Sequence, residues 1–255
     1  MINKNKKTVI ITGGAGRIGL ALTKDLIKKG HQVLIGDINK IKLIQIKKSI
    51  NSKNLIIFSS NLVNKKNIDK FIQYGLKKFK KIDVAVHCAY PKSKKWGTRF
   101  ENINEKSLKE DLTSQLGGTI IFSQCISKYF LKVKKGNLIL ISSIFGTQTP
   151  KFENYKNLEM ITPIEYSAIK SGIISITKYL AKYYQKKNIR INCVSPGGIK
   201  DNQPKIFIKR YKQYCSSKGM LDGSDISNLI VFLISDASKY VNGQNLIIDG
   251  GYTLV

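Results

Sequence analysis

Acidic side chains are scarce in this 255-residue chain. Only 16 residues are Asp or Glu, against 44 Lys and Arg, which gives a formal net charge of +28. An excess of this size is typical of proteins that bind nucleic acid or anionic membranes. Arginine is scarce as well, however, and nucleic-acid readers favour arginine for its bidentate contacts. Because the lysines are spread along the whole chain beside abundant Ile and Asn, an AT-rich coding sequence explains them better. Nucleic-acid binding stays a minor alternative.

Metal-ligating clusters, membrane spans and a leader peptide are also missing from the pattern. The four cysteines lie far apart with no CxxC or Cys/His group, which argues against a zinc site or a disulfide framework and predicts reduced, mostly buried thiols. No apolar run approaches the roughly 18 residues of a membrane helix. The N-terminal MINKNKKTVI runs straight into a β-type segment, without the apolar region of a signal peptide. We therefore expect a cytoplasmic protein with no metal and no membrane partner.

The sequence does contain a regular alternation of short apolar runs and longer amphipathic segments. This alternation is typical of βαβ units that build a parallel sheet covered by helices on both faces. No linker rich in Gly, Ser and Pro divides the chain, so it predicts one α/β domain over residues 1–255, a doubly wound Rossmann fold with seven parallel strands. The expected strands are 8–12, 32–37, 54–58, 83–88, 137–142, 190–195 and 245–249.

The first expected turn has the pattern of a dinucleotide site. Residues 14–19 read G-x-G-x-x-G, directly after a strand and at the opening of a helix. Such glycines permit a tight turn and let a pyrophosphate approach the backbone N–H groups at the helix N-terminus. Asp37 ends the second strand, where it would bind the adenosine ribose hydroxyls and repel a 2′-phosphate, which favours NAD. Arg17 in the same loop would tolerate that phosphate, so NADP stays open.

A tyrosine with a lysine four residues later occurs five times, so this spacing alone indicates little. The pairs are Tyr74/Lys78, Tyr90/Lys94, Tyr166/Lys170, Tyr183/Lys187 and Tyr214/Lys218. The surroundings favour Tyr166 and Lys170, because small residues flank them and would let a cofactor come close. Ser142 and Ser143 close the fifth expected strand, at the sheet edge where open α/β folds bind ligands. We therefore predict that Tyr166 and Lys170 form a proton-transfer pair near Ser143.

Six motifs follow one another along the chain: TGGAGRIG, the acid Asp37, SSIFG, YSAIK, NIRINCVSPGGI and NGQNLIIDGGY. In this order they resemble the short-chain dehydrogenase/reductase family, and the resemblance covers essentially the full length. It implies that Ser143 hydrogen-bonds the substrate oxygen and that Tyr166 is the general acid/base. Lys170 is implied to bind the nicotinamide ribose and to lower the pKa of the tyrosine. The physical chemistry agrees, because a phenol with a pKa of about 10 needs a neighbouring cation to act at neutral pH.

The resemblance also implies which residues hold the cofactor. They come from the glycine turn, the ends of the strands and the catalytic pair. The implied cofactor residues are Gly13, Ala15, Gly16, Arg17, Ile18, Gly19, Asp37, Ile38, Asn61, Leu62, Cys88, Ala89, Tyr166, Lys170, Pro196, Gly197 and Ile199.

Several residues depart from the family pattern. The usual NNAG after the fourth strand is HCAY here, so His87 replaces an Asn, and we favour a structural role for it over a catalytic one. The Asn that helps to relay protons through water is replaced by Gln115, which we retain as a candidate catalytic residue. Asn61 stands where an Asp often holds adenine. The glycine loop has the TGxxGxxG spacing of the extended branch of the family.

The substrate is expected between a loop at about 144–165 and a segment at about 198–222. The candidate substrate residues are Tyr90, Ser143, Phe152, Tyr155, Gly198 and Gln203. The stretches HCAYP, KFENY, PIEYSAIKSG, SPGGIKDNQP and KGML are similar to a subgroup of oxidoreductases encoded with flagellin-glycosylation and nonulosonic (legionaminic-type) acid genes, which implies a role in the synthesis of surface glycans of that type. That similarity implies an anionic substrate, either a sugar phosphate or a nucleotide-activated amino sugar.

Two alternatives stay open at this point. A 3-oxoacyl carrier-protein reductase would suit the basic surface, because its carrier is acidic, although the polar KFENYKN loop counts against an acyl chain. A non-catalytic dinucleotide fold that binds nucleic acid through its lysines is the other. The family resemblance further implies a homodimer or homotetramer that pairs through helices at 104–130 and 164–185.

Overall fold

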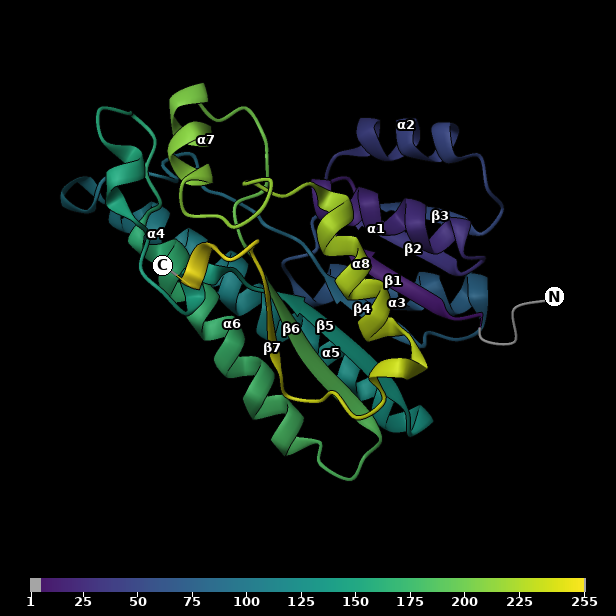
Figure 1. The fold of residues 1–255 in the computed structure, drawn as a ribbon. Coiled ribbons are helices and arrows are strands. Elements are labelled where there is room, and N and C mark those ends of the chain that lie inside the picture. Colours follow the sequence, from purple (N-terminus) through teal and green to yellow (C-terminus); the bar gives the residue numbers. More distant parts are fainter. Residues whose placement is uncertain (1–5, 255) are drawn as a thin grey trace.

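The computed structural model describes residues 6–254, and these residues form one seven-stranded parallel sheet with helices on both faces (Figure 1). The strand order is β3-β2-β1-β4-β5-β6-β7, which confirms the predicted doubly wound α/β fold. The observed bounds lie within two residues of the expected ones. The strands are β1 Thr8–Thr12, β2 Gln32–Asp37, β3 Leu55–Ser59, β4 Val84–His87, β5 Gly136–Ile141, β6 Ile189–Pro196 and β7 Asn245–Ile248.

The helices connect successive strands and cover the two faces of the sheet. None of the helices within residues 6–254 is long and apolar enough to cross a membrane. A π-helical turn, Leu112–Gly117, joins two of the helices into one continuous rod. The helices are α1 Arg17–Lys28, α2 Lys40–Ile50, α3 Lys65–Phe79, α4 Glu105–Asp111, α5 Gly118–Val133, α6 Ile164–Tyr183, α7 Lys205–Lys212 and α8 Gly223–Ile234.

The alternation of side chains along each strand divides the interior into two cores. Val9 and Ile11 of β1 face the core shared with α1, α2 and α8, whereas Ile10 faces the core shared with α3, α5 and α6. Successive side chains of a strand point to opposite faces, so a strand that is buried on both faces must be apolar throughout. This is why the sheet was visible in the sequence as continuous Val, Ile and Leu runs.

The strand order places a ligand crevice between β1 and β4. The chain leaves β1 toward β2 on one side, and after β3 it crosses to β4 on the other side. The loops that follow these two strands therefore diverge, and open α/β sheets bind ligands in the gap between them. The glycine turn after β1 and the loop after β4 both lie at this point.

A third, smaller core holds the segments above the carboxyl edge of the sheet. Its buried side chains come from the loop after β5, from α7 and from the C-terminal turn. The ring of Tyr211 stacks on Tyr252 with centroids 4.3 Å apart, and the Tyr211 hydroxyl accepts a hydrogen bond of 2.6 Å from the Gly198 amide. Arg210 of α7 donates 2.6 Å to the carbonyl of Lys156. These contacts join the predicted substrate-side segments, 144–165 and 198–222, to one another.

Helix α6 is bound directly to the end of β5. Ser142 Oγ donates to the Lys170 carbonyl (2.7 Å), and Lys170 Nζ donates back to the Ile141 carbonyl (3.1 Å). Ser171 Oγ adds a bond of 2.8 Å to the Gly146 carbonyl. The chain can come this close because Gly146 has no side chain: a Cβ there would lie 2.7 Å from the carbonyl carbon of Lys170. The spacing between β5 and α6 is therefore set by these few groups.

We expect Gly146→Ala to reduce the free energy of unfolding by about 1–3 kcal/mol, because an inserted methyl group must push the backbone of α6 away. Gly117→Ala is the matched control, since the nearest atom to its added Cβ is 3.9 Å away. Chemical denaturation of both variants tests this, and equal stability would contradict the role given to Gly146.

Candidate active site

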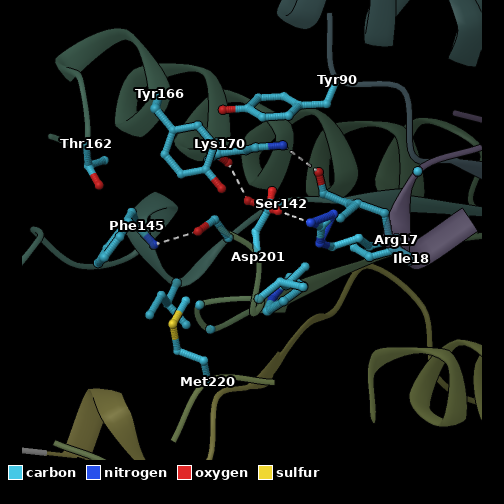
Figure 2. Close-up of a pocket in the computed structure, with 18 of the residues that line it drawn as sticks. Arg17, Ile18, Tyr90, Ser142, Phe145, Thr162, Tyr166, Lys170, Asp201 and Met220 are labelled. Atoms are coloured by element: carbon cyan, nitrogen blue, oxygen red, sulfur yellow. Dashed lines mark hydrogen bonds and ion pairs between the residues drawn. The ribbon is translucent and has the colours of Figure 1, made fainter. Parts of the chain in front are cut away.

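A cavity of about 450 Å³ opens at the carboxyl edge of the sheet. Its floor is the glycine turn after β1 and the end of β5, and its walls are the loops after β4, β5 and β6 (Figure 2). Seventeen of the residues predicted from the sequence line this cavity. They are Gly13, Gly16, Arg17, Ile18, Gly19, Cys88, Ala89, Tyr90, Ser143, Tyr155, Tyr166, Lys170, Pro196, Gly197, Gly198, Ile199 and Gln203.

The glycine turn presents an uncapped helix N-terminus to the cavity. Gly13 has a φ of +65°, and a Cβ on it would lie 2.6 Å from the Cys88 carbonyl oxygen, so only glycine fits. Gly16 precedes the first turn of α1, and neither a side-chain cap nor an acidic residue occupies that turn. The free N–H groups and the helix dipole favour an anion at this position. The turn therefore has the shape and the polarity that a pyrophosphate needs.

Asp37 ends β2 beside this turn. Its Oδ2 accepts a hydrogen bond of 3.0 Å from the Ala15 amide, and its Oδ1 accepts 2.9 Å from the Asn39 amide. The carboxylate is thus held at the rim of the glycine turn rather than in the cavity itself. Its place fits a group that binds the ribose next to a pyrophosphate.

Arg17 points across the cavity rather than toward Asp37. It forms an ion pair with Asp201, and its Nε donates to the Lys200 carbonyl at 3.0 Å (Figure 2). The pair links the start of α1 to the loop that follows β6. A 2′-phosphate beside Asp37 would have to draw Arg17 away from this partner, so the geometry weighs against the tolerance for NADP that Arg17 suggested.

Three of the four predicted catalytic residues, Ser143, Tyr166 and Lys170, line this cavity. Figure 2 shows Tyr166 and Lys170 beside each other. The Lys170 ammonium lies 5.5 Å from the centre of the Tyr166 ring. Ser143 Oγ accepts a hydrogen bond of 3.2 Å from the Phe145 amide. Helix α6 supplies Tyr166 and Lys170, and β5 leads into Ser143.

The pKa values at the floor differ from the simple expectation that the lysine lowers the pKa of the tyrosine. Burial raises the pKa of Tyr166, and the hydrogen bond from Ser143 only partly opposes this rise. Burial also lowers the pKa of Lys170 to about 8, so the ammonium form still predominates at pH 7. The lysine ammonium faces the tyrosine ring and donates to the Ile141 carbonyl.

Aromatic rings form the wall next to the catalytic tyrosine. Tyr90 and Trp96 meet Tyr166 edge to face, with ring centroids 5.8 Å and 6.1 Å from that of Tyr166. Tyr90 and Trp96 also meet each other at 5.5 Å. The sequence indicated Tyr90 as a lining residue but gave no signal for Trp96 or Lys92, because the loop after β4 has no periodicity. Both of these residues line the cavity.

His87 lies beneath the site in the core. Its ring stacks on Phe122 with centroids 4.7 Å apart, and its Nδ1 is 2.8 Å from Thr12 Oγ1. Burial, with a smaller contribution from the Lys170 charge, lowers the pKa of His87 to about 3. It does not line the cavity, so its place fits the structural role favoured from the sequence.

The remaining predicted residues lie outside the main cavity. Asn61, Leu62, Ile38, Asp37 and Ala15 cluster at the ends of β2 and β3 or in the glycine turn without lining it. Phe152 is 55% exposed and lines a second cavity of about 490 Å³ next to the first. Two predicted substrate residues that do line the main cavity are held by bonds within the protein: Tyr155 Oη lies 2.5 Å from Thr162 Oγ1, and Gln203 donates to the Ile199 carbonyl and accepts from the Asp201 amide.

Gln115 is buried in the π-helical turn and does not reach the cavity wall. Neither of its side-chain amide atoms has a hydrogen-bond partner among the described residues. A buried polar group without a partner costs free energy and is normally satisfied by water. Gln115 is therefore a buried amide that does not reach the catalytic residues in the cavity and whose polar atoms no group of the described residues satisfies.

Comparison with known proteins gives full-length matches. A family model described as enoyl-(acyl carrier protein) reductase matches residues 13–253. The chain is 40% identical to a post-translational flagellin modification protein A of Campylobacter coli, over 97% of this chain and 98% of that protein. It is 29% identical to a 3-oxoacyl-[acyl-carrier-protein] reductase of Buchnera aphidicola over the whole of both chains. Among solved structures, a short chain dehydrogenase from Leptospira borgpetersenii with bound NAD+ superposes with a TM-score of 0.88 at 32% identity, covering 99% of this chain and 97% of that one.

The buried His87 should make the protein sensitive to acid. Its pKa is lowered in the folded state, so the unfolded chain binds the proton more strongly and stability falls as the pH drops from about 6.5 toward the folded value of about 3. We expect proton uptake by His87 in the unfolded chain to lower the free energy of unfolding by about 2 kcal/mol when the pH falls from 6.5 to 5.

Denaturation at these two pH values checks this, with His87→Asn expected to lose most of the dependence. His31, the other histidine, is partly buried, and burial lowers its pKa as well but less than that of His87, so His31→Asn should lose only a smaller part of the dependence. An unchanged pH dependence in His87→Asn would show that other groups carry the acid sensitivity.

Proposed function

The chain belongs to the short-chain dehydrogenase/reductase family, and from that premise we propose that it interconverts a hydroxyl and a carbonyl with NAD(H) as its cofactor. One observation carries the proposal: the Tyr166 phenol, with Ser143 and the Lys170 ammonium, lies in the same cavity as the uncapped N-terminus of α1. A proton donor and an anion site that share one cavity are what hydride chemistry on a dinucleotide requires.

The residues of the glycine turn fit the cofactor. Gly13, Gly16 and the first turn of α1 would hold the pyrophosphate, and Asp37 would bind the ribose hydroxyls. When bound, a nicotinamide cofactor supplies or accepts the hydride. The bound NAD+ of the Leptospira relative supports NAD, and the engagement of Arg17 by Asp201 supports it further.

The protein's own part is to hold the substrate oxygen and to move one proton. In the reductive direction, the Ser143 and Tyr166 hydroxyls donate hydrogen bonds to the carbonyl oxygen, and the Tyr166 proton passes to that oxygen as negative charge develops on it. Burial keeps the phenol protonated at neutral pH, which is the form that reduction needs. The Lys170 ammonium beside the ring then stabilises the phenolate that remains.

The substrate is proposed to be a sugar phosphate or a nucleotide-activated amino sugar. Similarity to a flagellin modification protein over nearly the full chain supports this class, as does the wall of Tyr90 and Trp96, whose faces suit the apolar side of a sugar ring. The 3-oxoacyl carrier-protein reductase is the second candidate, supported by 29% identity to such an enzyme.

We also infer a homodimer or homotetramer built on α5 and α6. Ile120 and Val133 of α5 are exposed apolar residues, and Tyr179 and Tyr183 of α6 stack on each other while remaining about two-thirds exposed. Such rings on a helix surface favour burial against a second copy.

We expect Tyr166→Phe to lower kcat/KM by about 100- to 10,000-fold, because it removes the transferred proton while keeping the ring. The Kd for NADH should change little. Tyr183→Phe is the matched control: this tyrosine also has a lysine four residues later, but it is 67% exposed on the surface of the same helix.

Nicotinamide absorbance measures turnover against a panel of sugar phosphates, nucleotide sugars, a 3-oxoacyl thioester and an enoyl thioester. Turnover of a thioester alone would replace the sugar assignment. Full activity in Tyr166→Phe would remove Tyr166 from the mechanism.

Asp37→Asn should lower the preference for NAD+ over NADP+ by about tenfold or more, because the repulsion between a carboxylate and a 2′-phosphate is removed while an acceptor stays in place. Fluorescence titration with NADH and NADPH gives both Kd values. Asp69→Asn, an acid on the surface of α3, is the control. If the unaltered protein bound the two cofactors equally, Asp37 would not set the preference.

A further inference from the structure

Three cationic side chains face the main cavity, and two of them are already engaged. Arg17 is paired with Asp201, and Lys170 donates to the Ile141 carbonyl beside the catalytic ring. The third, Lys92, forms no ion pair with any residue in the described part of the chain. Its ammonium lies 4.9 Å from the centre of the Tyr90 ring. Lys92 is therefore a positive charge at the cavity whose partner comes from an aromatic face.

The backbone next to Lys92 is held by a buried carboxylate. The next residue, Ser93, is buried and gives two hydrogen bonds to the buried carboxylate of Asp111, 2.8 Å from its amide and 2.6 Å from its hydroxyl. The Trp96 amide donates back to the Ser93 carbonyl at 3.3 Å. Each oxygen of the Asp111 carboxylate accepts one of the two bonds from Ser93, and Asp111 forms no ion pair with Lys92. The loop after β4 thus presents Lys92 and Trp96 from a rigid base, which a binding site needs.

The ring of Tyr90 lies next to both Lys92 and the catalytic Tyr166. The Tyr90 ring centre lies 4.9 Å from the Lys92 ammonium and 5.1 Å from the Lys170 ammonium, and the ring meets that of Tyr166 edge to face at 5.8 Å. A ligand whose carbonyl lies at Tyr166 and Ser143 and whose ring lies against Tyr90 and Trp96 would therefore extend its far end toward Lys92. Lys92 and the catalytic pair thus lie around the same aromatic ring.

We propose that Lys92, beside the rings of Tyr90 and Trp96, forms the subsite that binds the anionic group of the substrate, a phosphate or carboxylate carried on the sugar. The inference rests on the proposed function, since it assumes that the sugar is oxidised or reduced at Tyr166. It goes further by identifying Lys92 as the residue that makes the protein bind acidic sugars more tightly than neutral ones.

The electrostatics favour an anion at this place. Burial lowers the pKa of Lys92. Among the described residues, no carboxylate lies within ion-pair distance of its ammonium to raise that pKa again. An anionic ligand group would supply the missing opposite charge, in surroundings less well screened than open water. Lys92, Lys94 and Lys95 are all exposed on the same loop, but of the three only Lys92 lines the cavity and faces an aromatic ring. Lys94 and Lys95 carry the same charge outside the cavity.

The protein contains its own reporter for the test, because Trp96 is the only tryptophan in the sequence and it lines the cavity. We would titrate the protein, saturated with NAD+, with glucose 6-phosphate, glucuronate and glucose while recording Trp96 fluorescence. The phosphate and carboxylate arms distinguish the two anionic groups, and glucose reports on the ring alone.

We expect at least one acidic sugar to bind more tightly than glucose. Lys92→Met should weaken that binding by about 10- to 100-fold, the range for a lost charged hydrogen bond, and leave glucose binding unchanged. Lys92→Arg should restore most of the affinity. Lys94→Met, the matched control on the same loop, should bind all three sugars as the unaltered protein does.

Equal affinities in Lys92→Met and Lys94→Met would overturn the proposal, as would equal binding of acidic and neutral sugars by the unaltered protein. A Kd for NAD+ that changed in Lys92→Met would instead assign Lys92 to the cofactor and overturn it too. The binding assay requires no turnover, so acidic sugars that bind through Lys92 but are never oxidised or reduced would count against the proposed function alone.

Discussion

The site depends on the hydrogen bonds that hold helix α6 against the end of β5. Ser142 and Lys170 exchange bonds with each other's backbone segments, at 2.7 Å to the Lys170 carbonyl and 3.1 Å to the Ile141 carbonyl. The second of these bonds uses the lysine that also faces the Tyr166 ring. The same ammonium therefore fixes the helix and provides the positive charge of the site. Because Gly146 leaves no spare space, a change in this contact moves Ser143 relative to Tyr166.

The five tyrosine–lysine pairs show what the spacing means once it is placed in a structure. In Tyr74/Lys78 the ammonium lies 5.6 Å from the ring centre, almost the distance seen in Tyr166/Lys170. Lys170 differs in being only 7% exposed, so its charge acts through a medium of low dielectric rather than through water. Contact between the two side chains is thus common to a surface pair and the candidate catalytic pair. Burial is what separates them.

The fold and the floor of the site were predictable because they depend on local signals. Continuous apolar runs gave all seven strands to within two residues, and the carboxyl ends of parallel strands must meet at one edge, which brought Gly13, Ser143 and Tyr166 into one cavity. The aromatic wall was not predictable in this way. Trp96 takes its place through Ser93, which bonds Asp111, and no periodicity marks a buried carboxylate 18 residues further along the chain.

The direction of the Tyr166 pKa shift was missed for a related reason. The sequence shows that a cation lies four residues away, but not that its ammonium turns to the ring face and a backbone carbonyl, nor how much water the phenol loses. With desolvation as the larger effect, the free site holds a neutral tyrosine. Any ionisation of that tyrosine must then accompany the charge that develops on the substrate oxygen.

Residues 198–222, which line the substrate side of the cavity, are attached to the N-terminus of α1, where the pyrophosphate of the cofactor would bind. Residues 198–222 rest on the small core around Tyr211 and Tyr252, and this core also buries Tyr155 from the loop after β5. From the other side, Arg17 at the start of α1 holds the same segment through Asp201 and the Lys200 carbonyl. An anion that enters at the N-terminus of α1 meets the first turn that bears Arg17, so it competes with Asp201 for that guanidinium. Arg17, which holds the substrate-side segment 198–222 through Asp201, thus belongs to the helix whose N-terminus would bind the pyrophosphate.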